Sequence, residues 1–93
     1  MTVFAKMPRA SKLRTLRAIL AVRADIVDRQ YCKCGRWPVL SESKNTEQVR
    51  CVHCGRSGLK VFIDDEPDLS RRVYLATLAW NIEHGDDATM IPF

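Results

Sequence analysis

The stretch YCKCGRWPVLSESKNTEQVRCVHCGR, residues 31–56, holds all four cysteines of the 93-residue chain. They come as two close pairs, Cys32 with Cys34 and Cys51 with Cys54, and a glycine follows each pair. Two thiols that lie one or two residues apart on a tight turn can both reach one metal ion, and four such sulfurs suit the tetrahedral coordination of zinc. The spacing therefore predicts one structural Zn²⁺ ion held by all four cysteines.

Other uses of the thiols stay open at this stage, namely an iron–sulfur centre, disulfides, or a redox Cys-x-x-Cys at 51–54. Residues 1–30 show no export signal, so we expect a cytoplasmic protein whose thiols stay reduced, which favours a metal over disulfides. His53 lies inside the second pair, where a side chain normally points outward, so we interpret it as a contact residue in preference to a ligand. Four thiolate ligands would leave no open coordination position for catalysis.

Two segments outside the cysteine region repeat apolar residues at helical spacing. In residues 11–30 these are Leu13, Leu16, Leu20 and Val27, and in residues 67–84 they are Leu69, Val73, Ala76 and Trp80. Pro67 suits the first helical position, which places the cap at Asp65 or Glu66.

Three short β-prone pieces lie between the helical segments: WPVL, EQVRCV and LKVFI. SESKNT, between the first two, is polar and predicts a hairpin tip. We therefore predict an α+β fold in which a small three-stranded zinc ribbon, about 31–63, is flanked by an N-terminal and a C-terminal amphipathic helix. A chain of 93 residues is expected to form a single domain, 1–93.

The two cysteine turns, residues 32–35 (the first knuckle) and 51–55 (the second knuckle), carry a family resemblance. CKCGRWPVL…VRCVHCGR, followed by GLKVFI, resembles a zinc ribbon, and its layout is similar to that of small phage regulators of the Com type. The likeness covers residues 31–63 and departs from the common pattern in the Cys-x-Cys pair. It implies a messenger-RNA-binding regulator, although zinc ribbons serve protein docking as well.

The charge balance is basic, with 15 Lys and Arg against 11 Asp and Glu and a net charge of +4. This excess permits a polyanionic partner without requiring one, and it also fits an ordinary solvated surface. Trp37 either covers the zinc site or the helices, or is exposed as a platform for a base or an anchor for a protein. The predicted contact residues for nucleic acid or another partner are Lys33, Arg36, Trp37, Arg50, His53, Arg56, Arg14 and Arg17.

These features favour a small zinc-ribbon regulator that binds RNA or DNA, and the small size suggests a phage or another mobile element. The alternative is a small inhibitor or adaptor that docks on a host protein or a defence complex, as an anti-CRISPR protein does. The broad apolar helix faces would also allow a homodimer. No run approaches the ~20 apolar residues of a membrane span, and no catalytic motif is present, so we expect neither a membrane partner nor an enzyme.

Overall fold

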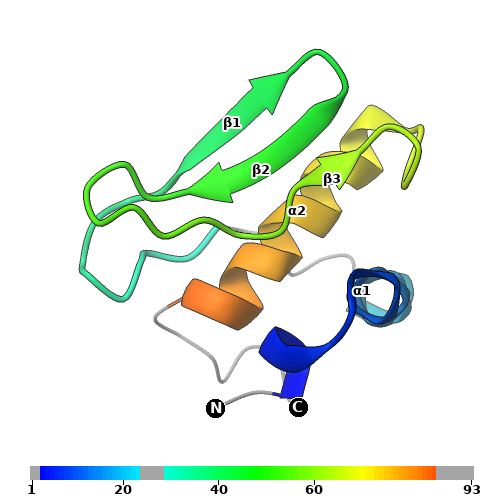
Figure 1. Ribbon diagram of the computed structural model, residues 1–93, viewed down its shortest axis with the longest axis horizontal. Coiled ribbons are helices and arrows are strands. Elements are labelled where there is room, and N and C mark those ends of the chain that lie inside the picture. Colours follow the sequence, from blue (N-terminus) through cyan, green and yellow to red (C-terminus); the bar gives the residue numbers. More distant parts are fainter. Residues whose placement is uncertain (1–2, 24–28, 86–93) are drawn as a thin grey trace.

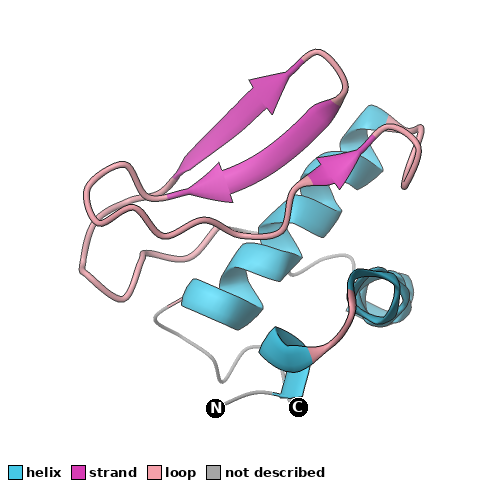
Figure 2. Cartoon of the chain, in the orientation of Figure 1, coloured by secondary structure: helices cyan, strands magenta, loops and turns pink. Residues whose placement is uncertain are grey.

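The computed structural model describes residues 3–23 and 29–85, and its helices and strands are labelled in Figure 1. In chain order the elements are the short 3-10 helix η1 (Val3–Lys6), α1 (Arg9–Arg23), β1 (Val39–Ser43), β2 (Thr46–Arg50), β3 (Val61–Phe62) and α2 (Leu69–His84). Two helices and a three-stranded antiparallel sheet confirm the predicted α+β class (Figure 2).

The sheet is ordered β1-β2-β3, and its centre is the β1–β2 hairpin. The register pairs Leu40 with Val49 and Ser43 with Thr46, which leaves a two-residue turn at 44–45. The strand β1 therefore includes Ser41–Ser43, which the sequence had suggested as part of the tip. Those residues are polar because β1 is an edge strand whose side chains are mostly solvent-accessible.

The helix α2 lies between the sheet and α1 (Figure 1). This central position explains why α2 is buried around most of its circumference, from Leu75 to Ile82, with Trp80 fully buried as predicted. The helix α1 buries the predicted stripe of Leu13, Leu16 and Leu20 against this layer. Leu69 is wrongly placed in the predicted apolar stripe, since it is exposed at the first residue of α2.

The helix boundaries differ from the predicted ones at three places. The helix α1 begins at Arg9, and its predicted C-terminal part falls on residues 24–28, outside the described residues, while Arg29 and Gln30 are not helical. The helix α2 is capped by Asp68, whose carboxylate accepts a hydrogen bond of 3.0 Å from the amide of Arg71. Asp68 outcompetes Asp65 and Glu66 as the cap because an acidic side chain directly before the helix reaches the free N–H groups of the first turn.

Candidate metal centre and knuckle surface

Each knuckle is a tight turn closed by its own backbone hydrogen bonds. In the first knuckle the Gly35 amide donates to the Cys32 carbonyl at 2.8 Å, and in the second the Gly55 amide donates to the Cys51 carbonyl at 2.9 Å. Both glycines have positive φ, 93° and 83°, a conformation that a residue with a Cβ adopts only at a cost. The Cys-x-Cys pair thus uses a turn one residue shorter than the Cys-x-x-Cys pair, and both turns end on a left-handed glycine.

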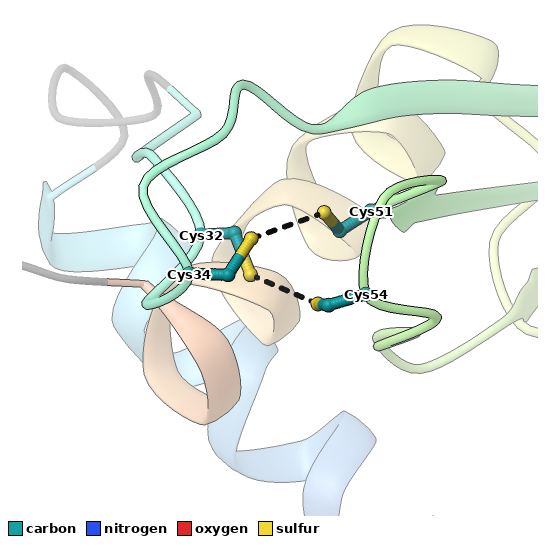
Figure 3. A group of neighbouring side chains, drawn as sticks. All are labelled: Cys32, Cys34, Cys51 and Cys54. Carbon is teal, nitrogen blue, oxygen red and sulfur yellow. Dashed lines mark hydrogen bonds between the residues drawn. The ribbon is translucent and has the colours of Figure 1, made fainter.

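The two knuckles bring the four cysteine sulfurs together (Figure 3). Two sulfur–sulfur contacts join one knuckle to the other: the sulfurs of Cys32 and Cys54 are 3.5 Å apart, and those of Cys34 and Cys51 are 3.6 Å apart. All four sulfurs lie within 4.8 Å of one another. The cysteines are free thiols, and the first of each pair is buried while the second is exposed.

These distances fit one tetrahedrally coordinated metal ion. With metal–sulfur bonds of about 2.3 Å, the edges of a tetrahedron of sulfurs are about 3.8 Å long, close to the observed contacts. The group that converges consists of the four cysteines alone, and His53 is exposed outside it. The arrangement is therefore able to bind one metal ion with a purely thiolate ligand set.

The C-terminal end of α2 supports the first knuckle. Cys32 forms an isolated β-bridge with Gly85, and the Lys33 amide donates to the His84 carbonyl at 3.2 Å. A Cβ on Gly85 would lie only 2.6 Å from the backbone carbonyl oxygen of Asn81, so only glycine permits this close approach. Cys32 and Cys51 are themselves part of the hydrophobic core, which ties the metal centre to the packing of α2.

Two further hydrogen bonds attach the helix to the knuckles. The indole N–H of Trp80 donates to the Gln30 carbonyl at 3.0 Å, just before the first knuckle. Nε2 of His84 lies 3.0 Å from the carbonyl oxygen of Ser57, just after the second knuckle. His84 was predicted only to lie near the negative end of the helix dipole, and no sequence signal indicated its contact with Ser57.

Arg56 approaches the thiols with its guanidinium group. Its Nη1 lies 3.3 Å from Sγ of Cys54 and 3.7 Å from Sγ of Cys32. The pKa of the Cys54 thiol is lowered to about 6, mainly by a hydrogen bond from the backbone amide of Arg56. Hydrogen bonds from neighbouring thiols and from the Arg56 guanidinium lower this pKa further, and together these effects outweigh burial, which raises it. At Cys34 the amide of Arg36 acts in the same direction, but burial and the other three thiols outweigh it and raise the pKa to about 11.

The structure divides the predicted contact residues into two groups. Around the knuckles the exposed ones are Lys33, Arg36, Trp37, Arg50, His53 and Arg56. The other two, Arg14 and Arg17, lie on α1, on the far side of α2 from the sheet (Figure 1). Arg17 donates to the Asp65 carbonyl, and Arg9 forms an ion pair with the Asp65 carboxylate. Both arginines are exposed, and Arg17 contacts the turn after β3.

Of the two predicted positions of Trp37, the structure shows the exposed one, with 49% of the residue's surface accessible. Its ring is contacted edge-on by Tyr31, at a centroid distance of 4.9 Å, and Cζ of Arg29 lies 5.4 Å from its centroid. Neither Tyr31 nor Arg29 was predicted as a neighbour of Trp37. The available signal was the presence of two aromatic and three basic residues within nine positions, 29–37.

No known protein family, curated protein or solved structure matches this chain. The likeness to Com-type regulators therefore depends on the layout of residues 31–63 alone. In the residues that the structure describes, no helix is long and apolar enough to cross a membrane.

Proposed function

We propose that Cys32, Cys34, Cys51 and Cys54 hold one Zn²⁺ ion with a structural role. The observation that supports the proposal is the convergence of four free thiols from two turns at near-tetrahedral spacing. Thiolate ligands favour zinc among the abundant divalent metals, and a site with four protein ligands has no position left for a substrate. When bound, zinc would link the two knuckles. In this proposal the chain is a binding protein and not an enzyme.

We further propose that the zinc-bound protein is a regulator that binds nucleic acid through its knuckle surface, the exposed side chains of Lys33, Arg36, Trp37, Arg50 and His53. The small size, together with an architecture that matches no known family, suggests a phage or another mobile element, which is the origin we expect. Binding RNA or DNA in this way would regulate translation or transcription.

The distribution of ion pairs carries this proposal. Within residues 3–23 and 29–85, the ion pairs are Arg9–Asp65, Lys12–Glu83, Arg71–Glu66 and Arg72–Glu47, so none involves a cation of the knuckle surface. Between residues 29 and 63 the acidic residues are Glu42 and Glu47, and Glu47 is buried. In the described part of the chain, the cations of the knuckle surface therefore have no carboxylate partner, and they would bind phosphate groups by releasing counterions.

The test is a titration of zinc-loaded protein with RNA and DNA oligonucleotides at several salt concentrations. With about three phosphate contacts, log Kd should change with log salt with a slope of about 2 for a single strand. Arg36→Glu should weaken binding and reduce this slope by about 1. Lys44→Glu is the matched control, because Lys44 is exposed in the turn between β1 and β2, at the opposite end of the hairpin from the knuckles. No binding at about 50 mM salt would rule the proposal out.

A second candidate is an inhibitor or adaptor that docks on a host protein or defence complex. It is favoured by exposed large apolar side chains in the segment that leads from β3 into α2, at Phe62, Ile63 and Leu69. The same side chains would serve a homodimer. A pull-down from lysate with and without nuclease distinguishes the candidates, since a partner that is retained after nuclease treatment favours protein docking.

A further inference from the structure

Tyr31 and Trp37 form an aromatic pair on the outside of the first knuckle. Tyr31 is 52% exposed and Trp37 is 49% exposed, although the two rings contact each other edge-to-face. Such large aromatic groups are costly to leave in water, and both lie beside the candidate metal centre and not over the core. The pair therefore has the character of a contact surface.

The indole ring of Trp37 is held in place before any partner arrives. Tyr31 contacts it from one side, and the guanidinium of Arg29 lies 5.4 Å from its centroid. The guanidinium is itself fixed, because Nη1 of Arg29 donates to the Pro38 carbonyl at 3.1 Å, and Pro38 is buried. About half of the indole nevertheless stays accessible. A ring that is already oriented loses little conformational entropy when a flat partner stacks on it.

The charge around the pair identifies the kind of partner. Lys33 and Arg36 are exposed between Tyr31 and Trp37 in the chain, and residues 29–41 contain no acidic side chain. An exposed aromatic ring with Arg29 beside it and two more exposed cations in the same short segment complements a ligand that combines a planar ring with negative charge. A nucleobase on its phosphate backbone has both properties.

We propose that Trp37, held by Tyr31 and Arg29, is a stacking platform for an unpaired base of single-stranded nucleic acid. This inference rests on the nucleic-acid binding proposed above and makes it more specific, since a base inside a duplex presents no free face to the indole. Stacking tolerates any base, so the platform gives preference for single strands over duplexes and little preference for sequence.

The chain provides its own probe for this contact. It has two tryptophans, of which Trp37 is exposed and Trp80 is fully buried. Zinc-loaded protein is titrated with an unstructured single strand of about 12 nucleotides, as RNA and as DNA, and with the duplex of the same sequence. The single strand should quench the Trp37 emission, leave the buried Trp80 emission as background, and bind at least about fivefold more tightly than the duplex. The RNA and DNA arms show which sugar the site accepts.

Variants assign the signal to the ring. Trp37→Ala should weaken single-strand binding by about 5- to 150-fold, the range measured for loss of one base–aromatic stack. Trp37→Phe removes the fluorescence signal but keeps a flat ring, so it should retain most of the affinity. Tyr74→Ala is the matched control, since Tyr74 is an exposed aromatic residue on α2, and it should change nothing.

The failures of the two proposals are distinguishable. Binding of oligonucleotides without quenching, with equal affinity for strand and duplex, or with full affinity in Trp37→Ala, would overturn the platform and leave nucleic-acid binding intact. Absence of binding to every oligonucleotide would overturn both. A third outcome is that a nuclease-treated protein fraction protects Trp37 from acrylamide quenching while no oligonucleotide does. The aromatic pair would then belong to a protein-docking surface, which would overturn the platform. Metal content and circular dichroism of Trp37→Ala serve as the folding control, and the wild-type quenching result does not depend on that variant.

Discussion

At the scale of single residues, Arg36 and Arg56 occupy equivalent places, each directly after the glycine of a knuckle. Their backbones act alike: the Cys32 amide donates to the Arg36 carbonyl, and the Cys51 amide donates to the Arg56 carbonyl. Their side chains differ, because the guanidinium of Arg56 contacts two thiol sulfurs, and in the described part of the chain the guanidinium of Arg36 contacts none. A cation that donates hydrogen bonds to thiolates offsets the net negative charge of a zinc ion with four thiolate ligands. In the proposed zinc centre, Arg56 would therefore be a supporting residue as well as a predicted contact residue.

The difference between the two side chains predicts different effects on metal binding. Arg56→Met should lower the zinc affinity by about 10- to 100-fold, the range for loss of a supporting hydrogen bond around a metal. Arg36→Met is the matched control, since it also removes a guanidinium group and keeps the backbone hydrogen bonds. It should leave the zinc affinity unchanged. Competition with a chromophoric chelator measures both. Equal affinities for the two variants would show that the guanidinium of Arg56 does not support the centre.

At the scale of elements, β2 contacts α2 through a buried ion pair. Glu47 and Arg72 are 2% and 6% exposed, and Nε of Arg72 lies 3.8 Å from Oε2 of Glu47. Among the described residues, the other Glu47 oxygen, Oε1, has no hydrogen-bond partner. Burial raises the pKa of Glu47, and the facing carboxylate of Glu42 adds to this effect, while Arg72 opposes it. The folded protein thus holds the Glu47 proton more tightly than the unfolded chain does.

It follows that Glu47 contributes most stability when protonated. This contribution is present below pH 4.5, the ordinary pKa of the group, and is lost as pH rises through the higher pKa of the folded state. Compared with Glu47→Gln, which does not titrate, the wild type should therefore lose free energy of unfolding as pH rises above 4.5. Urea unfolding of both proteins in excess zinc measures the difference between their free energies of unfolding at each pH. Release of the metal in acid affects both proteins alike, so it cancels from this difference. This account of Glu47 would be contradicted if the stability of the wild type relative to Glu47→Gln stayed constant or increased as pH rises.

The elements also show what sequence patterns can predict. The repeated Cys–Gly spacing predicted both knuckles because a thiol pair on a turn needs a residue that accepts positive φ, and Leu13, Leu16 and Leu20 predicted the buried face of α1. The period of two in β2 places Glu47 on the same side as Val49 and Cys51, yet its burial was not expected, because patterning treats a carboxylate as exposed. The pairing with Arg72 depends on which helix covers the sheet, and that is a tertiary property.

At the scale of the whole molecule, the metal is predicted to decide whether the fold persists. A structural zinc site contributes about 10–16 kcal/mol of apparent binding energy at neutral pH, comparable to the net stability of a whole domain, about 5–15 kcal/mol. In this chain the core includes Cys32 and Cys51, and the end of α2 is bridged to the first knuckle. Loss of the metal should therefore loosen the helix as well as the sheet.

We expect one zinc ion per chain by elemental analysis, and Cys51→Ser should lose it and unfold the sheet. Hydrogen exchange should then be fast in β1–β3 and accelerated at the C-terminal end of α2. Val52→Ala is the matched control in the same knuckle, since Val52 is 67% exposed and its truncation should change stability by less than about 0.5 kcal/mol. A metal-free wild-type protein with the same protection pattern would disprove the zinc centre.

The arrangement of the contact surface was the least predictable feature at this scale. The sequence grouped Arg14 and Arg17 with the knuckle residues on the assumption that the N-terminal helix lies beside the ribbon. In the structure α2 separates α1 from the sheet, and Arg17 contacts the turn after β3 (Figure 1). Which helix lies in the middle depends on the total apolar area of each, and α2 is the helix that is apolar around most of its circumference.

One sulfur of each cysteine pair faces the interior and the other faces solvent, with Cys34 and Cys54 on the outside. A competing chelator or an oxidant that arrives from solution would meet these two first, while Cys32 and Cys51 still retain the ion. Ligand exchange would then proceed stepwise from the outer side, at a rate set by the two outer bonds. Any macromolecule that covers the outer sulfurs would slow this exchange, so that occupancy by a partner and lifetime of the metal become linked.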